Sequence, residues 1–183
     1  MSEGDDDEGP SLEKLNLSFT LLIAYVVPGL LGAIALEPRF EQLKRLLAPA
    51  NTGLTAAAIV PLLLLCLAVG VVLNAFSWAV IRTMIHATGV KAPALPYWRM
   101  TPETIPVYQE FVESNFRFYQ AYSNLLGALI LLSVSSLLDC WPPPWWEGLL
   151  VLVVISLLFA AARDSLSRSY RNLHNLLNRK EPS

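Results

Sequence analysis

The chain has 183 residues, of which 54% are hydrophobic and only 15% are charged. Soluble domains carry about 25% charged residues, so this composition excludes an ordinary soluble globular protein. The net charge of −2 argues against a nucleic-acid-binding surface, and the two cysteines are too few for a disulfide framework. The lipid bilayer is therefore the expected partner, and no nucleic acid is expected.

The N-terminal segment 1–15 is acidic, and we predict a disordered tail because it is too polar to bury a core. Residues 16–183 are predicted to form a single transmembrane domain. A cleaved signal peptide is the alternative for the first apolar run, since Ala33-Ile34-Ala35 resembles a cleavage site. The residues before that run hold six acidic residues and one lysine, however, whereas a signal peptide begins with positive charge. We therefore expect the run to span the membrane.

Four long apolar runs define the predicted membrane spans. A helix needs about 20 residues to cross a hydrocarbon core of about 30 Å, and the runs lack the period-two alternation of barrel strands. Asp139 and Glu147 stand at the edges of the last two runs, where they can be hydrated. The predicted fold is an all-α integral membrane protein with four transmembrane helices, at about 17–36, 54–76, 121–139 and 146–162.

The segments between the spans also carry signals. Residues Glu37–Leu47 are predicted to form an amphipathic helix along the outer interface, ended by the breaker 48–53. The second span has no breaker until Gly89, and one continuous helix is predicted over about 104–139. The fourth span continues as a helix over 163–178. Helices 2, 3 and 4 are thus expected to extend into the cytoplasm as a short helical stalk.

The distribution of positive charge predicts the orientation. With four spans, both termini and the segment 77–120 lie on one side, which carries 10 of the 13 lysines and arginines. Positive charge accumulates on the cytoplasmic side, so both termini are predicted to be cytoplasmic. The arginine-over-lysine, Ala/Leu-rich composition favours the plasma membrane of a bacterium, that is, the inner membrane.

Motifs for catalysis are not found. The sequence has no phosphate-binding loop, no His-Glu-x-x-His and no Gly-x-Ser-x-Gly, and its two histidines, His86 and His174, are far apart. Ionisable groups at membrane depth, which proton- and ion-coupled transport needs, are missing from the runs. We therefore predict a protein that is not an enzyme, with no catalytic residues, no cofactor and no metal.

One short pattern resembles a known enzyme family. The segment Arg168-Ser-Tyr-Arg-Asn-Leu-His174 is similar to the Arg-x5-His spacing of HEPN-type ribonucleases over seven residues. The resemblance implies a ribonuclease site in the C-terminal helix, which we keep as a remote alternative. On a regular helix the two side chains would lie about 120° apart. The preferred interpretation is a set of basic anchors at a lipid headgroup surface.

Small and polar residues inside the spans are the remaining candidates for function. The pairs Ser123-x3-Gly127, Gly29-x3-Ala33 and Ser156-x3-Ala160 have the small-x3-small spacing that lets helix backbones approach closely. Packing inside one chain is the favoured interpretation, and an interface between protomers or a weakly polar pore lining is the sharper one. The candidate interface or pore residues are Asn124, Ala128, Ser135, Gly127, Gly29 and Ala33. The candidate cytoplasmic partner or lipid contacts are Phe111, Phe118, Arg117, Arg168, Arg171 and His174.

Two functions of different classes follow. In the first, the protein is a self-assembling membrane module, a pore or membrane effector gated by its cytoplasmic stalk. In the second, it is an accessory or scaffold subunit that anchors a larger membrane complex through the same aromatic and apolar surfaces. The expected partner is a further copy of the chain or another subunit of a membrane complex.

Overall fold

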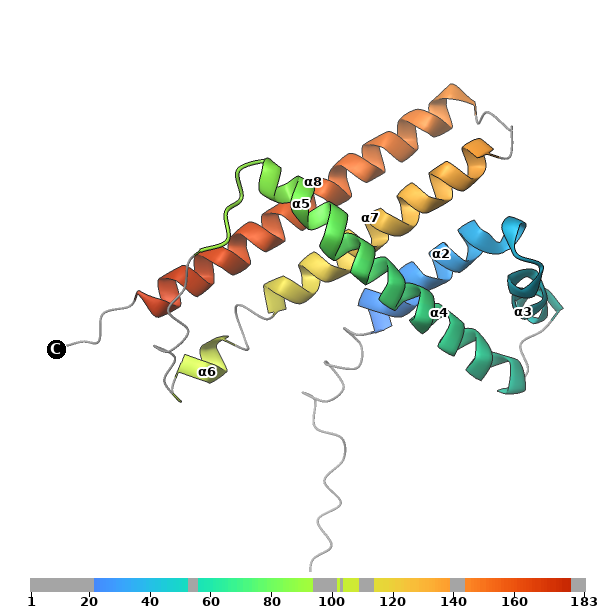
Figure 1. Ribbon diagram of the computed structural model, residues 1–183, viewed down its shortest axis with the longest axis horizontal. Coiled ribbons are helices and arrows are strands. Elements are labelled where there is room, and N and C mark those ends of the chain that lie inside the picture. Colours follow the sequence, from blue (N-terminus) through green and yellow to red (C-terminus); the bar gives the residue numbers. More distant parts are fainter. Residues whose placement is uncertain are drawn as a thin grey trace, which may run out of the picture.

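The computed structural model describes residues 22–52, 56–93, 102, 104–108, 114–138 and 144–178. Every regular element in these residues is helical, which confirms the prediction of an all-α chain (Figure 1). The elements are η1 (Leu22–Val26), α2 (Val27–Leu36), η2 (Glu37–Arg39), α3 (Glu41–Thr52), α4 (Ala56–Phe76), η3 (Ser77–Ile81), α5 (Arg82–Ala87), α6 (Thr104–Val107), α7 (Ser114–Leu138) and α8 (Trp145–Leu177).

Three helices in the described residues are long and apolar enough to cross a membrane: Ile59–Ala87, Ser114–Leu138 and Trp145–Leu176. They overlap the second, third and fourth predicted spans and extend beyond them toward the segment 77–120 and the C-terminal tail. Of the first predicted span, the described part is η1 and α2, with 5 and 10 residues. At about 1.5 Å per residue this part is about 22 Å long, shorter than a hydrocarbon core of about 30 Å. Residues 17–21 lie outside the described residues.

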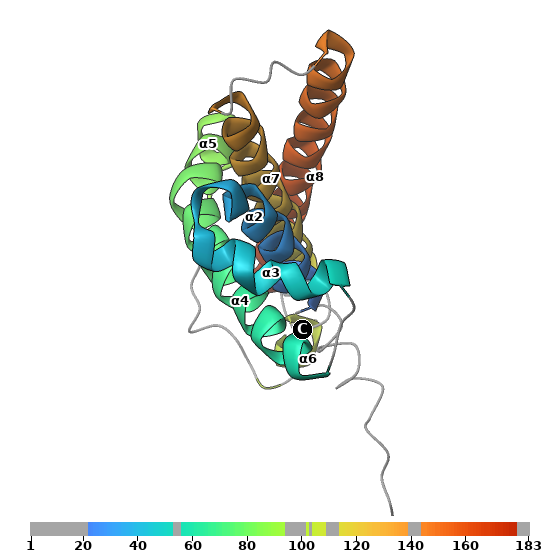
Figure 2. The same ribbon diagram turned by 90° about the vertical axis from the view of Figure 1, so that its right-hand side faces the viewer.

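The helices do not form a bundle of parallel rods. Helix α2 packs against both α4 and α7, and α7 packs along α8. Helices α4, η3 and α5 follow one another without a break and cross α2 and α7 steeply (Figure 1). Helix α8 separates from α7 toward the end of α7 and the beginning of α8 (Figure 2). Much of the N-terminal half of α8 is therefore left without a neighbour among the described helices.

Glycines allow α4 to cross the N-terminal helix at close range. A Cβ on Gly29 would lie 1.7 Å from the carbonyl oxygen of Cys66, and a Cβ on Gly70 would lie 2.2 Å from that of Tyr25. Any side chain at these two positions would overlap the backbone of the other helix. Each of the two helices therefore contributes a glycine that the close crossing requires, as in small-residue contacts of membrane helices.

One predicted boundary differs from the structure. Helix α3 continues through Pro49 to Thr52, although residues 48–53 were expected to end it. A proline lacks one amide hydrogen, so the carbonyl four residues earlier loses its usual donor. A helix can tolerate this loss when another hydrogen-bond donor reaches that carbonyl. Of the continuous helix predicted over about 104–139, the structure describes α6 and α7, and residues 109–113 between them lie outside the described residues.

The ends of α5 and α8 agree with the extended helices that the sequence predicts. Helix α5 ends at Ala87, and two residues later Gly89 has a φ of +92°, which is strained for any residue with a side chain, and its amide donates to the His86 carbonyl. Helix α8 has 33 residues, which corresponds to about 50 Å. This length exceeds the thickness of a hydrocarbon core, which is about 30 Å.

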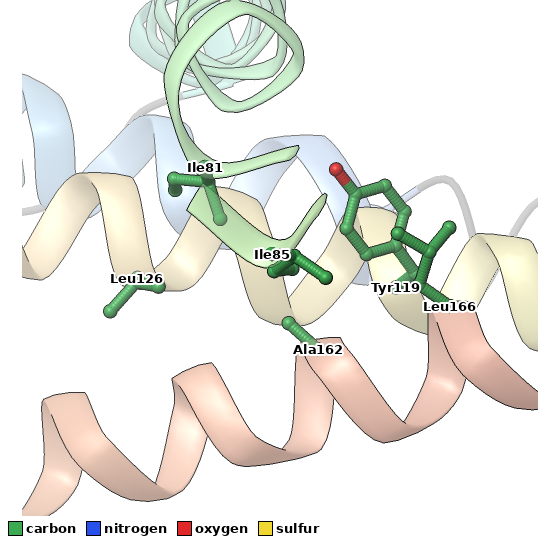
Figure 3. Packing of buried hydrophobic residues seen from close by; sticks show 6 residues of the cluster. All are labelled: Ile81, Ile85, Tyr119, Leu126, Ala162 and Leu166. Atoms are coloured by element: carbon green, nitrogen blue, oxygen red, sulfur yellow. The ribbon is translucent and has the colours of Figure 1, made fainter. Parts of the chain in front are cut away.

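The buried core lies where three helical segments meet (Figure 3). Ile81 and Ile85 come from η3 and α5, Tyr119 and Leu126 from α7, and Ala162 and Leu166 from α8. Each of these six side chains is at most 2% exposed. The start of α7 therefore packs against the C-terminal half of α8, and the end of the α4–α5 helix closes this contact from a third side.

Candidate functional site

The polar residue Asn124 of α7 is placed against a break in the N-terminal helix. Pro28 has no amide hydrogen, so it cannot donate to the carbonyl of Ala24 four residues earlier. The Nδ2 of Asn124 donates to that carbonyl at 2.9 Å, and the Asn124 side chain is fully buried. In an apolar environment an unpaired carbonyl is costly, so Asn124 supplies the hydrogen bond that Pro28 cannot.

A second polar contact fastens α7 to the end of α4. The Ser77 hydroxyl of η3 donates to the Ser123 carbonyl at 3.0 Å, and both residues are 1% exposed. One turn further along α7, a Cβ added to Gly127 would lie at ordinary contact distance from the Phe76 and Ser77 side chains. The Ser123-x3-Gly127 pair is thus used for packing inside the chain.

The other candidate interface residues are also placed inside the chain. Gly29 and Ala33 are buried on α2, and Ala128 is buried on α7. Ser135 is 7% exposed, and its carbonyl accepts a hydrogen bond of 2.9 Å from Arg39. The structure therefore gathers all six candidate residues, Asn124, Ala128, Ser135, Gly127, Gly29 and Ala33, in the contacts of α7 and α2 within one chain.

The third small-x3-small pair behaves differently. Ser156 and Ala160 are both exposed on α8, and the Ser156 hydroxyl donates to the Leu152 carbonyl of its own helix at 2.8 Å. Gly148 lies eight residues before Ser156 on α8, and a Cβ added to it would have no atom within 4 Å. Ser156 and Ala160 thus form an exposed small-residue strip of α8 in the described chain.

The candidate cytoplasmic contacts fall into two groups. Phe118 is 52% exposed and lines a shallow hollow together with Asp164 and Arg168, which form an ion pair of 2.7 Å. Arg171 and His174 line a different pocket, on another side of α8. Arg117 is half-buried near the start of α7, and Phe111 lies outside the described residues.

The structure does not bring together the two residues of the Arg-x5-His pattern. Arg168 is paired with Asp164 and lines the hollow beside Phe118. His174 lines the second pocket, and its ring contacts the Nδ2 of Asn178 at 2.9 Å. The two side chains therefore face different pockets, as the helical geometry predicts.

A cluster around Arg82, which the sequence interpretation does not single out, joins α5 to α8. The Arg82 guanidinium lies 4.0 Å from the ring centre of Trp78, a cation–π distance. Its Nε donates to the Nε2 of His86 at 3.2 Å, and its Nη2 donates to the Tyr170 hydroxyl at 3.1 Å. The His86 and Tyr170 rings are stacked with centroids 6.0 Å apart. One guanidinium thus holds three aromatic side chains from two helices.

The hydrogen bonds of His86 define its tautomer. Because Arg82 is always a donor, the Nε2 of His86 must accept and therefore carries no hydrogen. The Nδ1 then carries the ring hydrogen and donates to the Val90 carbonyl at 2.5 Å. A neutral histidine is used here as a connector between Arg82 and the turn after α5. The only sequence signal was the spacing of Arg82 and His86, one helical turn apart.

Among the described residues, no group of three or more His, Cys, Asp or Glu side chains is arranged to hold a metal ion. Comparison of the chain with protein-family models, with curated proteins and with solved structures found no match.

Proposed function

We propose that this protein is a non-enzymatic membrane module that assembles with further copies of itself in the bilayer. The assembly acts on the membrane, as a pore or a membrane effector. Four spans with both termini in the cytoplasm, in a bacterial inner membrane, are part of the proposal. The C-terminal half of α8 and the start of α7, which pack together around Tyr119 and Leu166, would then form the cytoplasmic element that gates the assembly.

The exposed strip of α8 carries the proposal. Only 11% of the most apolar window of α8 is buried, against 39% for α7. Lipid tails are as apolar as leucine, so exposed leucines alone do not drive association in a membrane. Small residues do, because they let two backbones approach and gain van der Waals contacts. Ser156 and Ala160 are the small pair that the chain does not use itself, and we assign them to the contact with a second copy.

The test is the mass of the particle in native mass spectrometry after gentle extraction. We expect one species at a multiple of 20.2 kDa. The variant Ala160→Phe should shift it to 20.2 kDa, because the larger side chain holds the two α8 backbones apart. Ala75→Phe makes the same change at an exposed position of α4 and should leave the assembly intact. A wild-type particle at the mass of one chain would overturn self-assembly.

Membrane action is tested separately by conductance across planar bilayers that contain the purified protein. Wild type and Ala75→Phe should conduct, and Ala160→Phe should lose most of the conductance along with the assembly. An intact assembly that neither conducts nor releases a dye from vesicles would contradict the pore and effector roles.

The exposed Phe118 favours the alternative of an anchoring subunit. Phe118 is 52% exposed and lies beside the Asp164–Arg168 ion pair. The ring offers an apolar contact to a partner, and the ion pair offers a polar one. A native mass that requires other chains would support this alternative. Phe118→Glu should then release the partner, whereas Met84→Glu, at a position 53% exposed on α5, should not.

A further inference from the structure

A shallow pocket of about 350 Å³ lies between the turn after α5 and the C-terminal half of α8. Its polar lining is Lys91 from the turn and Arg163, Ser167, Tyr170, Arg171 and His174 from α8. On α8, Arg163, Ser167, Tyr170 and His174 follow one another at intervals of four, three and four residues, so they share one face of the helix, and Arg171 adjoins Tyr170. No acidic residue of the described chain lines the pocket.

No acidic side chain among the described residues cancels the positive charge of this pocket locally. Arg168, the neighbouring cation on α8, is paired with Asp164 on another side of the helix. Arg163 uses its Nε to donate to the Thr88 hydroxyl at 3.0 Å, and its two terminal nitrogens have no partner in the described part of the chain. Three cations and a histidine therefore converge on one space and create a positive potential there.

The Arg82 cluster prepares a further donor for the pocket. The Tyr170 oxygen accepts a hydrogen bond from Arg82 at 3.1 Å, so the hydroxyl hydrogen of Tyr170 is left to donate elsewhere. A hydroxyl that accepts from a guanidinium is polarised and becomes a stronger donor. With the Ser167 hydroxyl, the pocket offers neutral donors between its charged ones, a combination that suits the several oxygens of a phosphate group.

The pocket also lies at a defined depth. The apolar helix Ile59–Ala87 ends two residues before Gly89, and the uncharged part of α8 ends at Ala162, just before Arg163. Two candidate spans thus leave the apolar zone at this pocket, where phospholipid headgroups lie. We infer that the pocket binds a phosphate-bearing anion, held by Lys91, Arg163, Arg171 and the Tyr170 hydroxyl. The inference does not depend on self-assembly.

The test is the apparent Tm of the detergent-purified protein, titrated at constant ionic strength with phosphatidylglycerol, with phosphatidylcholine or with inorganic phosphate. A ligand of the folded state raises Tm with a saturable concentration dependence. A rise with phosphatidylglycerol but not with inorganic phosphate identifies the headgroup of an anionic lipid. A rise with both identifies a site for the phosphate group itself.

The variant Arg163→Gln/Arg171→Gln should weaken the response by about tenfold or more, since charge-assisted hydrogen bonds are lost. The variant Lys91→Gln/Arg171→Gln keeps the Arg163–Thr88 contact and should show the same loss of response. It replaces the first variant in the comparison if loss of that contact impairs folding. Lys44→Gln/Arg45→Gln removes the same charge from exposed positions of α3 and should respond like wild type. The inference is overturned if all three variants respond alike, which is non-specific attraction, or if neither anion raises the Tm of the wild type.

Discussion

At the scale of single residues, the polar side chains of the spans serve backbone groups that the helices cannot satisfy themselves. Asn124 donates to the Ala24 carbonyl, which Pro28 leaves without its usual donor. Ser77 donates to the Ser123 carbonyl across the contact of η3 and α7. Such bonds contribute about 1 kcal/mol each in membrane proteins, and losing one leaves a buried polar group unpaired.

A double-mutant cycle tests the link between Asn124 and Pro28. We expect Asn124→Ala to lower the free energy of unfolding by about 1–2 kcal/mol, because the Ala24 carbonyl loses its donor. In a Pro28→Ala background the amide of residue 28 can donate to that carbonyl, so the same change should cost about 1 kcal/mol less. The measurement is reversible unfolding in mixed micelles. Asn74→Ala, on the half-buried Asn74 of α4, should cost the same in both backgrounds.

Arg82 gives a second test at this scale. Arg82→Lys keeps the charge but loses the planar fork that reaches His86 and Tyr170 together and stacks on Trp78. We expect a loss of about 1–2 kcal/mol of unfolding free energy in the same assay. Arg45→Lys, whose ion pair with Glu41 is 3.7 Å long and largely exposed, should change it by less than about 0.5 kcal/mol. Equal effects of the two changes would contradict a structural role for the Arg82 cluster.

At the scale of elements, backbone proximity decides how the helices cross. Gly29 and Gly70 bring α4 against the N-terminal helix so closely that a Cβ would overlap a carbonyl group on either side. The neighbouring Gly32 has only side-chain atoms of Val69 and Leu73 near its Cβ position, which can move. The steep crossing therefore depends on the first two glycines more than on the third.

Glycine substitutions should separate these contributions. Gly29→Ala places a methyl group 1.7 Å from the Cys66 carbonyl oxygen, so the helices must move apart. We expect a loss of about 2 kcal/mol or more in unfolding free energy. Gly148→Ala, at a helical position with nothing within 4 Å, should be neutral or stabilising by up to about 1 kcal/mol. An unfolding free energy of Gly29→Ala equal to that of the wild type would contradict the close crossing of α4 and α2 in micelles.

At the scale of the whole molecule, the number of spans decides the side on which the N-terminus lies. Three helices of the described chain can cross a membrane, and α2 lies against α4 and α7. With four spans the N-terminus shares the side of the C-terminus, and with three it lies on the opposite side. Residues 1–21 are outside the described residues, so the distinction requires a topology measurement.

Cysteine labelling gives that measurement. In a background with Cys66 and Cys140 replaced by alanine, single cysteines at Ser2, Lys44 and Ser183 are reacted with a membrane-impermeant maleimide on whole cells. Under the four-span proposal, only Lys44→Cys should react before permeabilisation, and Ser2→Cys and Ser183→Cys only after it. Reaction of Ser2→Cys together with Lys44→Cys on intact cells would show that the first apolar run does not cross.

The sequence by itself determined the helical class and the positions of three spans, because apolar runs of membrane-spanning length have few other solutions. It also identified Asn124, Gly29 and Gly127 as unusual, since polar and small residues stand out among leucines. Only the tertiary structure decided what these residues do. The separation of Asn124 from Ala24 by 100 positions cannot be read from local spacing. Similarly, Lys91 and Arg163 meet in one pocket because α5 ends beside the middle of α8. Helix formation depends on neighbours along the chain, whereas the shared pocket depends on the crossing of helices, which a few glycine contacts set.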